Sequence, residues 1–159
     1  MRKAILMMLF AVVSNGALAG DLEDGIAAYQ KKDYATALKL FRSVAATNNA
    51  PAQLNLGRMH YFGEGVPQDY KKAVEWFRLA AKQGDAKAQY LLGMLYNSGD
   101  GVIQDYIRAY MWNSLAVASG YKDAGMYREF VAAEMTQQQI SEAQKMVKEC
   151  LANDYKGCD

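Results

Sequence analysis

Residues 56–70 read LGRMHYFGEGVPQDY, and residues 92–106 read LGMLYNSGDGVIQDY. The second stretch begins 36 residues after the first, and the Leu-Gly start, the Gly-x-Gly-Val centre and the closing Gln-Asp-Tyr align without a gap. A fixed period of this length is the signature of a repeat array, in which each unit buries its apolar face against its neighbours. The fold is therefore expected to be built by stacking.

The same offset continues beyond these two stretches. It relates Trp76 to Trp112 and Gly84 to Gly120, after which the pattern fades. A weaker copy precedes them, with Asn48 in the place of Gly84. Glycine and asparagine both tolerate the left-handed conformation that ends a helix, so we interpret this position as the end of each unit.

Each copy predicts two helices, at about 51–62 and 70–83 in the first, joined by a glycine turn. Asp69 is placed to cap the second helix, as is Asp105 in the next copy. Gly57 costs about 1 kcal/mol relative to alanine inside a helix, which suggests that a partner helix approaches closely there. The same argument holds for its counterpart one repeat later. One face of each helix is predicted to be core: Ala52, Leu56, Met59 and His60 in the first, and Ala73, Trp76, Phe77 and Ala80 in the second. Trp112, which matches Trp76 one repeat later, is also predicted to be core.

The pattern Leu-Gly-x-x-His/Tyr, then Gly-x-Gly-Val-x-x-Asp-Tyr-x-x-Ala-x-x-Trp and Ala-Ala/Val-x-x-Gly, resembles the Sel1-like repeat, a relative of the tetratricopeptide repeat. The match is specific over 52–84 and 88–120, with His60 for the usual tyrosine and Ile103 for a common proline. The resemblance implies an all-α fold, an α/α superhelix (α-solenoid) of antiparallel helix pairs with about eight helices.

The repeats and the segments on either side of them predict how the chain is divided. The predicted segments are a signal peptide at 1–19, a repeat domain at 20–151 and a tail at 152–159. Within the domain we expect a degenerate repeat at 21–49, repeats at 50–84 and 86–120, and C-terminal capping helices at 122–151.

The C-terminal part contains a second capping signal and both cysteines. Thr136 and Gln139 have the spacing of a capping box, which opens a last helix running through Cys150. Cys150 and Cys158 are the only cysteines, and an even count in an exported chain favours a disulfide. They form no Cys-x-x-Cys, and the one histidine is distant in sequence, so we expect neither a metal site nor a cofactor.

The first residues have the order of a secretory signal peptide. Arg2 and Lys3 precede an apolar run of ten residues at 4–13, and Ala-Leu-Ala at 17–19 provides a cleavage site after Ala19. The run is too short to span a membrane as a helix, which takes about 20 residues. We therefore expect a periplasmic or secreted protein with no stable membrane insertion after cleavage.

Charge narrows the classes of partner. Without Arg2 and Lys3 the chain has 16 basic and 17 acidic residues, a net charge of −1. No basic surface for nucleic acid and no polybasic lipid-binding run is predicted. We expect a monomer whose partner is a protein or a peptide.

Two motifs could indicate catalysis. His60, the only histidine, occupies a repeat position where an aromatic normally packs, so we interpret it as a core residue. Ser119-Gly-Tyr-Lys122 matches the Ser-x-x-Lys motif of penicillin-recognising enzymes. That chemistry needs serine and lysine one turn apart on a helix, and Gly120 should end the helix between them. A cell-wall-related or β-lactam-binding or hydrolysing enzyme, a description given to some exported Sel1-like proteins, stays the alternative to a non-catalytic adaptor.

In tetratricopeptide-type arrays the first helix of each pair lines a concave groove, and the resemblance places a partner there. For Leu54, Met94 and Met126 we favour core packing. For Arg58, Tyr61 and Tyr90, exposure in the groove and packing in the core are equally expected. The candidate groove residues are Ile26, Leu54, Arg58, Tyr61, Tyr90, Met94, Asn97, Met126 and Phe130.

Overall fold

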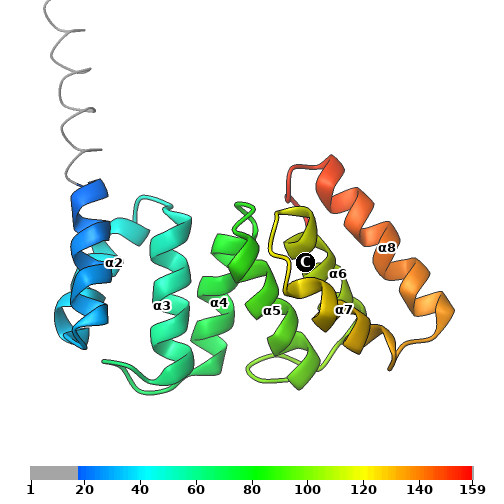
Figure 1. The fold of residues 1–159 in the computed structure, drawn as a ribbon, viewed down its shortest axis with the longest axis horizontal. Coiled ribbons are helices and arrows are strands. Elements are labelled where there is room, and N and C mark those ends of the chain that lie inside the picture. The colour runs from blue at the N-terminus through cyan, green and yellow to red at the C-terminus, as the bar shows by residue number, and fades with distance from the viewer. Residues whose placement is uncertain (1–17, 159) are drawn as a thin grey trace, which may run out of the picture.

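The computed structural model describes residues 18–158, and all regular structure in that range is helical (Figure 1). The predicted signal peptide lies almost entirely outside these residues. A leading helix occupies residues 18–30. The remaining helices are α2 (Tyr34–Ala45), α3 (Ala50–Phe62), α4 (Tyr70–Ala81), α5 (Ala86–Ser98), α6 (Tyr106–Ala118), α7 (Ala124–Ala132) and α8 (Gln137–Ala152).

The helices stack in the order of the chain. Each packs on the next from α2 to α7, and α6 also packs on α8, so the array extends along one long axis (Figure 1). No helix among residues 18–158 has both the length and the apolar composition to cross a membrane. The expected all-α solenoid is confirmed.

Short polar side chains fix where the helices begin. The carboxylate of Asp69 accepts a hydrogen bond from the Lys72 N–H at 3.0 Å, and Asp105 accepts one from the Arg108 N–H at 2.9 Å. The Lys72 N–H also holds the pKa of the Asp69 carboxyl below its ordinary value. Each such cap gives a partner to a backbone N–H that the first turn of a helix leaves without one. Both predicted caps are confirmed, and three further helices begin in the same way, at Asp33, Asn49 and Asp85.

Left-handed residues end the repeat units where the sequence predicts them. Gly84 has a φ of 83° and Asn48 a φ of 62°. Two predicted helix ends shift, however. The helix after Asp69 ends at Ala81 and is followed by the closing turn, and the first of the capping helices expected from residue 122 begins only at Ala124.

Gly57 allows the two helices of a pair to meet. A Cβ added there would lie 2.5 Å from the ring of Phe77 on α4. Gly93 on α5 abuts the side chain of Asn113 on α6 in the same manner. The close approach inferred from the cost of a helical glycine is therefore confirmed in both repeats.

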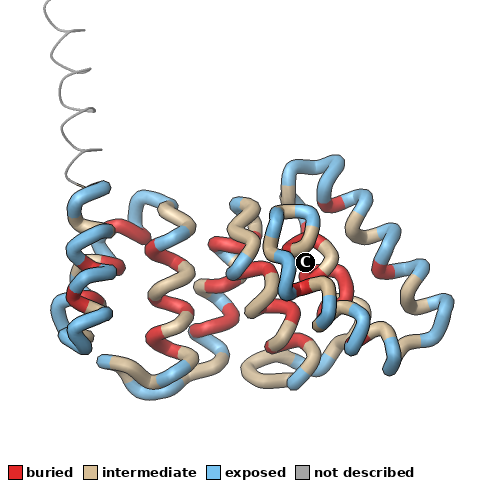
Figure 2. Tube along the Cα trace, viewed as in Figure 1, coloured by how far each residue is buried: buried red, intermediate tan, exposed pale blue. Residues whose placement is uncertain are grey.

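The buried residues form two clusters. Figure 2 shows buried residues in red at intervals along the helices. The larger cluster contains Trp112, whose side chain is fully buried. The smaller, N-terminal cluster contains Phe41 and Leu56, and Trp76 packs against it while remaining half-buried. Both tryptophans were predicted to lie in the core. This is right for Trp112, whereas Trp76 packs at the edge of the smaller cluster and is only half-buried.

The C-terminal segment contains a capped helix and a disulfide loop that packs back on α6. Thr136 and Gln139 form the predicted capping box of α8. Cys150 and Cys158 form the expected disulfide, with Cα atoms 5.2 Å apart. The loop between them brings the Tyr155 hydroxyl to 3.1 Å from the Ser119 hydroxyl at the end of α6.

Candidate functional site

The candidate groove residues all come from the first helices of the pairs, which are residues 18–30, α3, α5 and α7. We call the surface they share the first-helix face. Three candidates are exposed on it: Ile26, Met126 and Phe130. The other six are half-buried: Leu54, Arg58, Tyr61, Tyr90, Met94 and Asn97.

Met126 corrects one expectation. Core packing was favoured for it, but its side chain is 76 % exposed. The buried positions of α7 are Ala124 and Val131, and Met126 points away from them. Leu54 and Tyr61, in contrast, pack against the larger cluster while keeping part of their surface in solvent.

At the N-terminal end of this face, polar groups join the leading copy to the next repeat. The Arg58 guanidinium lies 5.3 Å from the centre of the Tyr29 ring. The hydroxyls of Tyr29 and Tyr34 both donate to the carboxylate of Glu64, in the glycine turn after α3. Burial, and then the bond to Glu64, raises the pKa of Tyr29 to about 12. We call Tyr29, Tyr34, Arg58 and Glu64 the tyrosine–glutamate cluster.

Within this cluster the Arg58 guanidinium already contacts the Tyr29 ring of its own chain. A guanidinium stacked on a tyrosine ring inside its own chain is a structural contact between helices, worth about 0.5–1 kcal/mol at a partly exposed site. Sequence reasoning selected Arg58 but missed Glu64, which it treated only as part of a turn. The structure therefore places this end of the face among the contacts that hold the array together.

At the other end, aromatic rings from α5, from α7 and from the turn before α7 form a continuous group. The centre of the Tyr90 ring lies 5.0 Å from that of Tyr121 and 5.8 Å from that of Tyr127. The Tyr127 ring in turn lies 5.8 Å from that of Phe130. With Met126, these residues form what we call the C-terminal aromatic patch.

The patch has an ordered inner side and an exposed outer side. The Asn97 amide donates to the Tyr127 hydroxyl at 3.0 Å, which ties α5 to α7. Burial raises the pKa of Tyr90 and of Tyr127, as expected for phenols partly removed from water. Phe130, by contrast, is 59 % exposed. Ordered aromatic rings beside exposed apolar side chains are typical of surfaces that bind other proteins.

Sequence reasoning found Tyr90, Met126 and Phe130 of this patch but not Tyr121 or Tyr127. The repeat offset maps Tyr90 onto Met126, one residue before the tyrosine that touches it. The concentration of aromatic residues between positions 121 and 130 is the signal that could have found them.

The catalytic candidates do not assemble a reactive site. Helix α6 ends at Ala118, and Gly120 has a φ of 95°, so Ser119 and Lys122 do not lie one turn apart on a helix. The Ser119 hydroxyl instead meets the Tyr155 hydroxyl. His60 is buried in the helix pair, as the sequence predicted, and burial lowers its pKa.

Comparison with known proteins agrees with the repeat. A family model described as Sel1 repeat matches residues 17–46, 50–85 and 86–121. None of the curated proteins matches the chain.

Two solved structures are similar to it. A protective antigen of uropathogenic Escherichia coli that displays an SLR fold has a TM-score of 0.83 and 27 % identity, over 92 % of this chain and 32 % of the other. A Sel1 repeat protein from Oxalobacter formigenes has a TM-score of 0.66 and 32 % identity, over 70 % of this chain and 46 % of the other. The chain thus spans less than half the length of either.

Proposed function

The chain belongs to the Sel1 repeat family, and on this premise we propose that it is a non-catalytic scaffold that binds a protein or peptide of the bacterial envelope. The repeats of this family typically mediate protein interactions, and stacked repeats present an extended surface suited to that work. The observation that carries the proposal is the C-terminal aromatic patch on the first-helix face.

The patch has the physical properties of an interaction surface. Met126 and Phe130 are four residues apart on α7, so they lie on one side of the helix and expose neighbouring apolar surface. Tyr90 and Tyr127 are already ordered by their contacts with other residues. A partner therefore gains contact with large rings without a full loss of side-chain entropy on binding.

The proposed location is the periplasm or the exterior of the cell. Support comes from the order of charged, apolar and small residues at 1–19 and from the Cys150–Cys158 disulfide, which suits an oxidising compartment. An envelope partner follows from that location.

A hydrolytic function receives no support from the geometry at Ser119. Purified protein is expected to leave nitrocefin unchanged beyond the rate in buffer, and Ser119→Ala should behave identically. Turnover that disappears in Ser119→Ala would instead establish the enzyme alternative and remove the claim that the protein is non-catalytic.

The binding proposal is tested by pulldown from envelope extract with chemical crosslinking. Met126→Ser and Phe130→Ser remove exposed apolar surface from the patch, and each is expected to reduce recovery of the partner about tenfold, the effect of a typical hot-spot residue. Ile103→Ser is the matched control, because Ile103 is 90 % exposed but lies on the loop between α5 and α6. Recovery that falls equally in all three variants, or in none, contradicts the proposal.

A further inference from the structure

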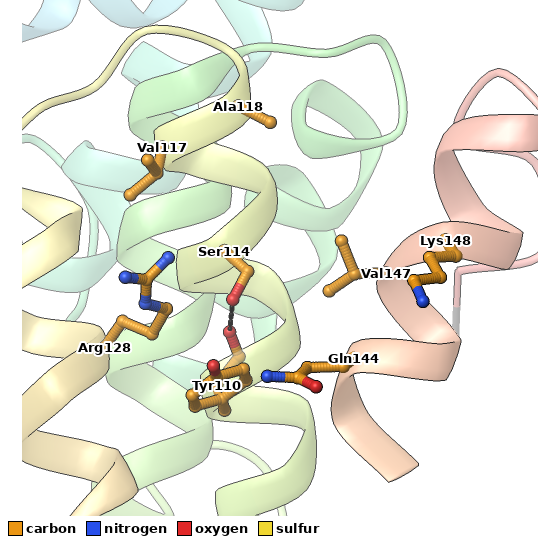
Figure 3. A pocket seen from close by; sticks show the side chains of 8 residues that line it. All are labelled: Tyr110, Ser114, Val117, Ala118, Arg128, Gln144, Val147 and Lys148. Atoms are coloured by element: carbon orange, nitrogen blue, oxygen red, sulfur yellow. Dashed lines mark hydrogen bonds between the residues drawn. The ribbon is translucent and has the colours of Figure 1, made fainter. Parts of the chain in front are cut away.

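A cavity of about 380 Å³ lies between α6, α7 and α8, and none of its lining residues belongs to the candidate groove predicted from the sequence. Figure 3 shows it from close by, with the side chains of α6 and α7 on one side and those of α8 on the other. It is lined by Tyr110, Ser114, Val117, Ala118, Arg128, Gln144, Val147 and Lys148.

The interior of the cavity is mostly apolar. Val117, Ala118 and Val147 present aliphatic groups, and Tyr110 contributes its ring. The Ser114 hydroxyl donates to the Tyr110 carbonyl at 2.8 Å, so its hydrogen is already used within the chain. An apolar side chain would therefore be the favoured occupant of the interior.

Cations stand on opposite sides of this interior. Arg128 on α7 lies 5.9 Å from the centre of the Tyr110 ring and contacts the carboxylate of Glu129 at 2.7 Å. Glu129 is itself mostly exposed, so this pair is readily exchanged for another carboxylate. Lys148 on α8 forms no ion pair among residues 18–158. None of the eight lining residues is acidic.

We propose that this cavity binds a peptide segment that inserts one aliphatic side chain between α6 and α8 and carries a carboxylate on each side of it. Arg128 receives one carboxylate and Lys148 the other, which gives charge complementarity across the apolar interior. The site is separate from the C-terminal aromatic patch, whose rings come from α5, from α7 and from the turn between α6 and α7.

The size and the polar groups of the cavity favour a peptide over a fatty acid. Its volume is near the lower limit of ligand pockets, about 300 Å³, which suits a side chain with its adjoining backbone. The Gln144 amide, which extends towards Tyr110 in Figure 3, has both a donor and an acceptor. That pair matches a peptide bond, and a fatty acid has no such group.

The test is a titration of isotope-labelled protein followed by amide chemical shifts. The probe is a short acetylated, amidated peptide in which a leucine is flanked by two glutamates. We expect saturable shifts at Val117 and at the Gln144 side chain by about 5 mM peptide. Matched peptides replace the leucine by alanine, or both glutamates by lysine, and each should bind at least about fivefold more weakly.

Variants of the protein locate the site. Lys148→Glu is expected to weaken binding of the glutamate peptide roughly fivefold or more. Lys145→Glu is the control, because Lys145 is an exposed residue of the same helix that does not line the cavity. Ala118 is an exposed residue that lines the cavity, so Ala118→Phe should fill the cavity and abolish the shifts at the Gln144 side chain. Tyr90→Ala, in the aromatic patch, should leave the affinity unchanged.

Three results overturn the inference: no saturable shift with the glutamate peptide, equal affinity for the lysine peptide, or equal losses in Lys148→Glu and Lys145→Glu. Shifts produced by laurate but not by the peptide would assign the cavity to fatty acids and would also overturn it. Because the aromatic patch is tested with other variants, failure here leaves the proposed scaffold function standing.

Discussion

Glycines on the first helices decide how closely each pair of helices packs. At Gly57 the ring of Phe77 occupies the space that a side chain would need, whereas at Gly125 on α7 an added Cβ would meet only a Val117 methyl at 3.9 Å. Gly57 lies inside α3, where alanine is favoured over glycine by about 1 kcal/mol, and Gly125 is the second residue of α7, where the gain in helix propensity is smaller. The two sites differ most in packing.

Gly57→Ala is therefore expected to lower the free energy of unfolding by about 1–3 kcal/mol, because overpacking outweighs the gain in helix propensity. Gly125→Ala serves as its control and should raise the free energy of unfolding by about 0.5–1 kcal/mol, since its Cβ finds ordinary contact distance. Urea denaturation of both variants measures the difference. Equal effects would show that Gly57 has no packing role.

The tyrosine–glutamate cluster gives stability a pH dependence. The folded pKa of Tyr29, about 12, lies above the ordinary value of 10.0. The contribution of Tyr29 to the free energy of unfolding is therefore fully present below about pH 10 and is lost as the pH rises from 10 to 12. Glu64→Gln removes one cause of the raised pKa but leaves burial, so the fall in stability over that window should become shallower. Urea denaturation at several pH values tests this, and an unchanged slope in Glu64→Gln would contradict it.

At the scale of the element, the sequence predicted best what depends on a few local atoms. The caps at Asp69, Asp105 and Thr136 follow from a side chain that bonds the backbone three residues away. Residues whose position depends on tertiary packing were predicted less well. Tyr127 was missed because α7 departs from the repeat, and the half-burial of Trp76 depends on packing against residues distant in the sequence.

The C-terminal tail contacts the ends of two repeat helices. Tyr155 reaches the Ser119 hydroxyl and lies against Gly84, so the disulfide loop contacts the ends of α6 and α4. Reducing the disulfide, which joins residues 8 positions apart, should lower the free energy of unfolding by about 2–3 kcal/mol.

Thermal unfolding with and without a reductant measures this effect, with a variant in which both cysteines are serine as the control. Tyr155→Phe keeps the disulfide but removes the hydroxyl contact, and should cost about 1 kcal/mol. If reduction leaves the melting temperature unchanged, the tail does not brace the repeats.

At the scale of the whole molecule, the array has two cores of different size. The N-terminal cluster is formed by the leading helix, α2 and α3, and the larger cluster extends from α4 to the C-terminal disulfide. Because stability in a repeat protein is largely a sum of neighbour contacts, the end with the smaller cluster should open first.

Amide hydrogen exchange is accordingly expected to be faster at 18–45 than in α5 and α6. The ratio should be at least about tenfold at neutral pH, which corresponds to roughly 1.4 kcal/mol in local opening free energy. Uniform protection along the chain would mean that the array opens as a single unit.

Binding of a partner protein through the C-terminal aromatic patch is tested by site-specific photo-crosslinking. A benzophenone side chain is placed at position 126, which is 76 % exposed in the patch, or at position 103, which is 90 % exposed outside it. After irradiation in envelope extract, a defined crosslinked protein is expected from position 126, absent from position 103 and weakened by Phe130→Ser. The same products from both positions, or none from position 126, would contradict the account.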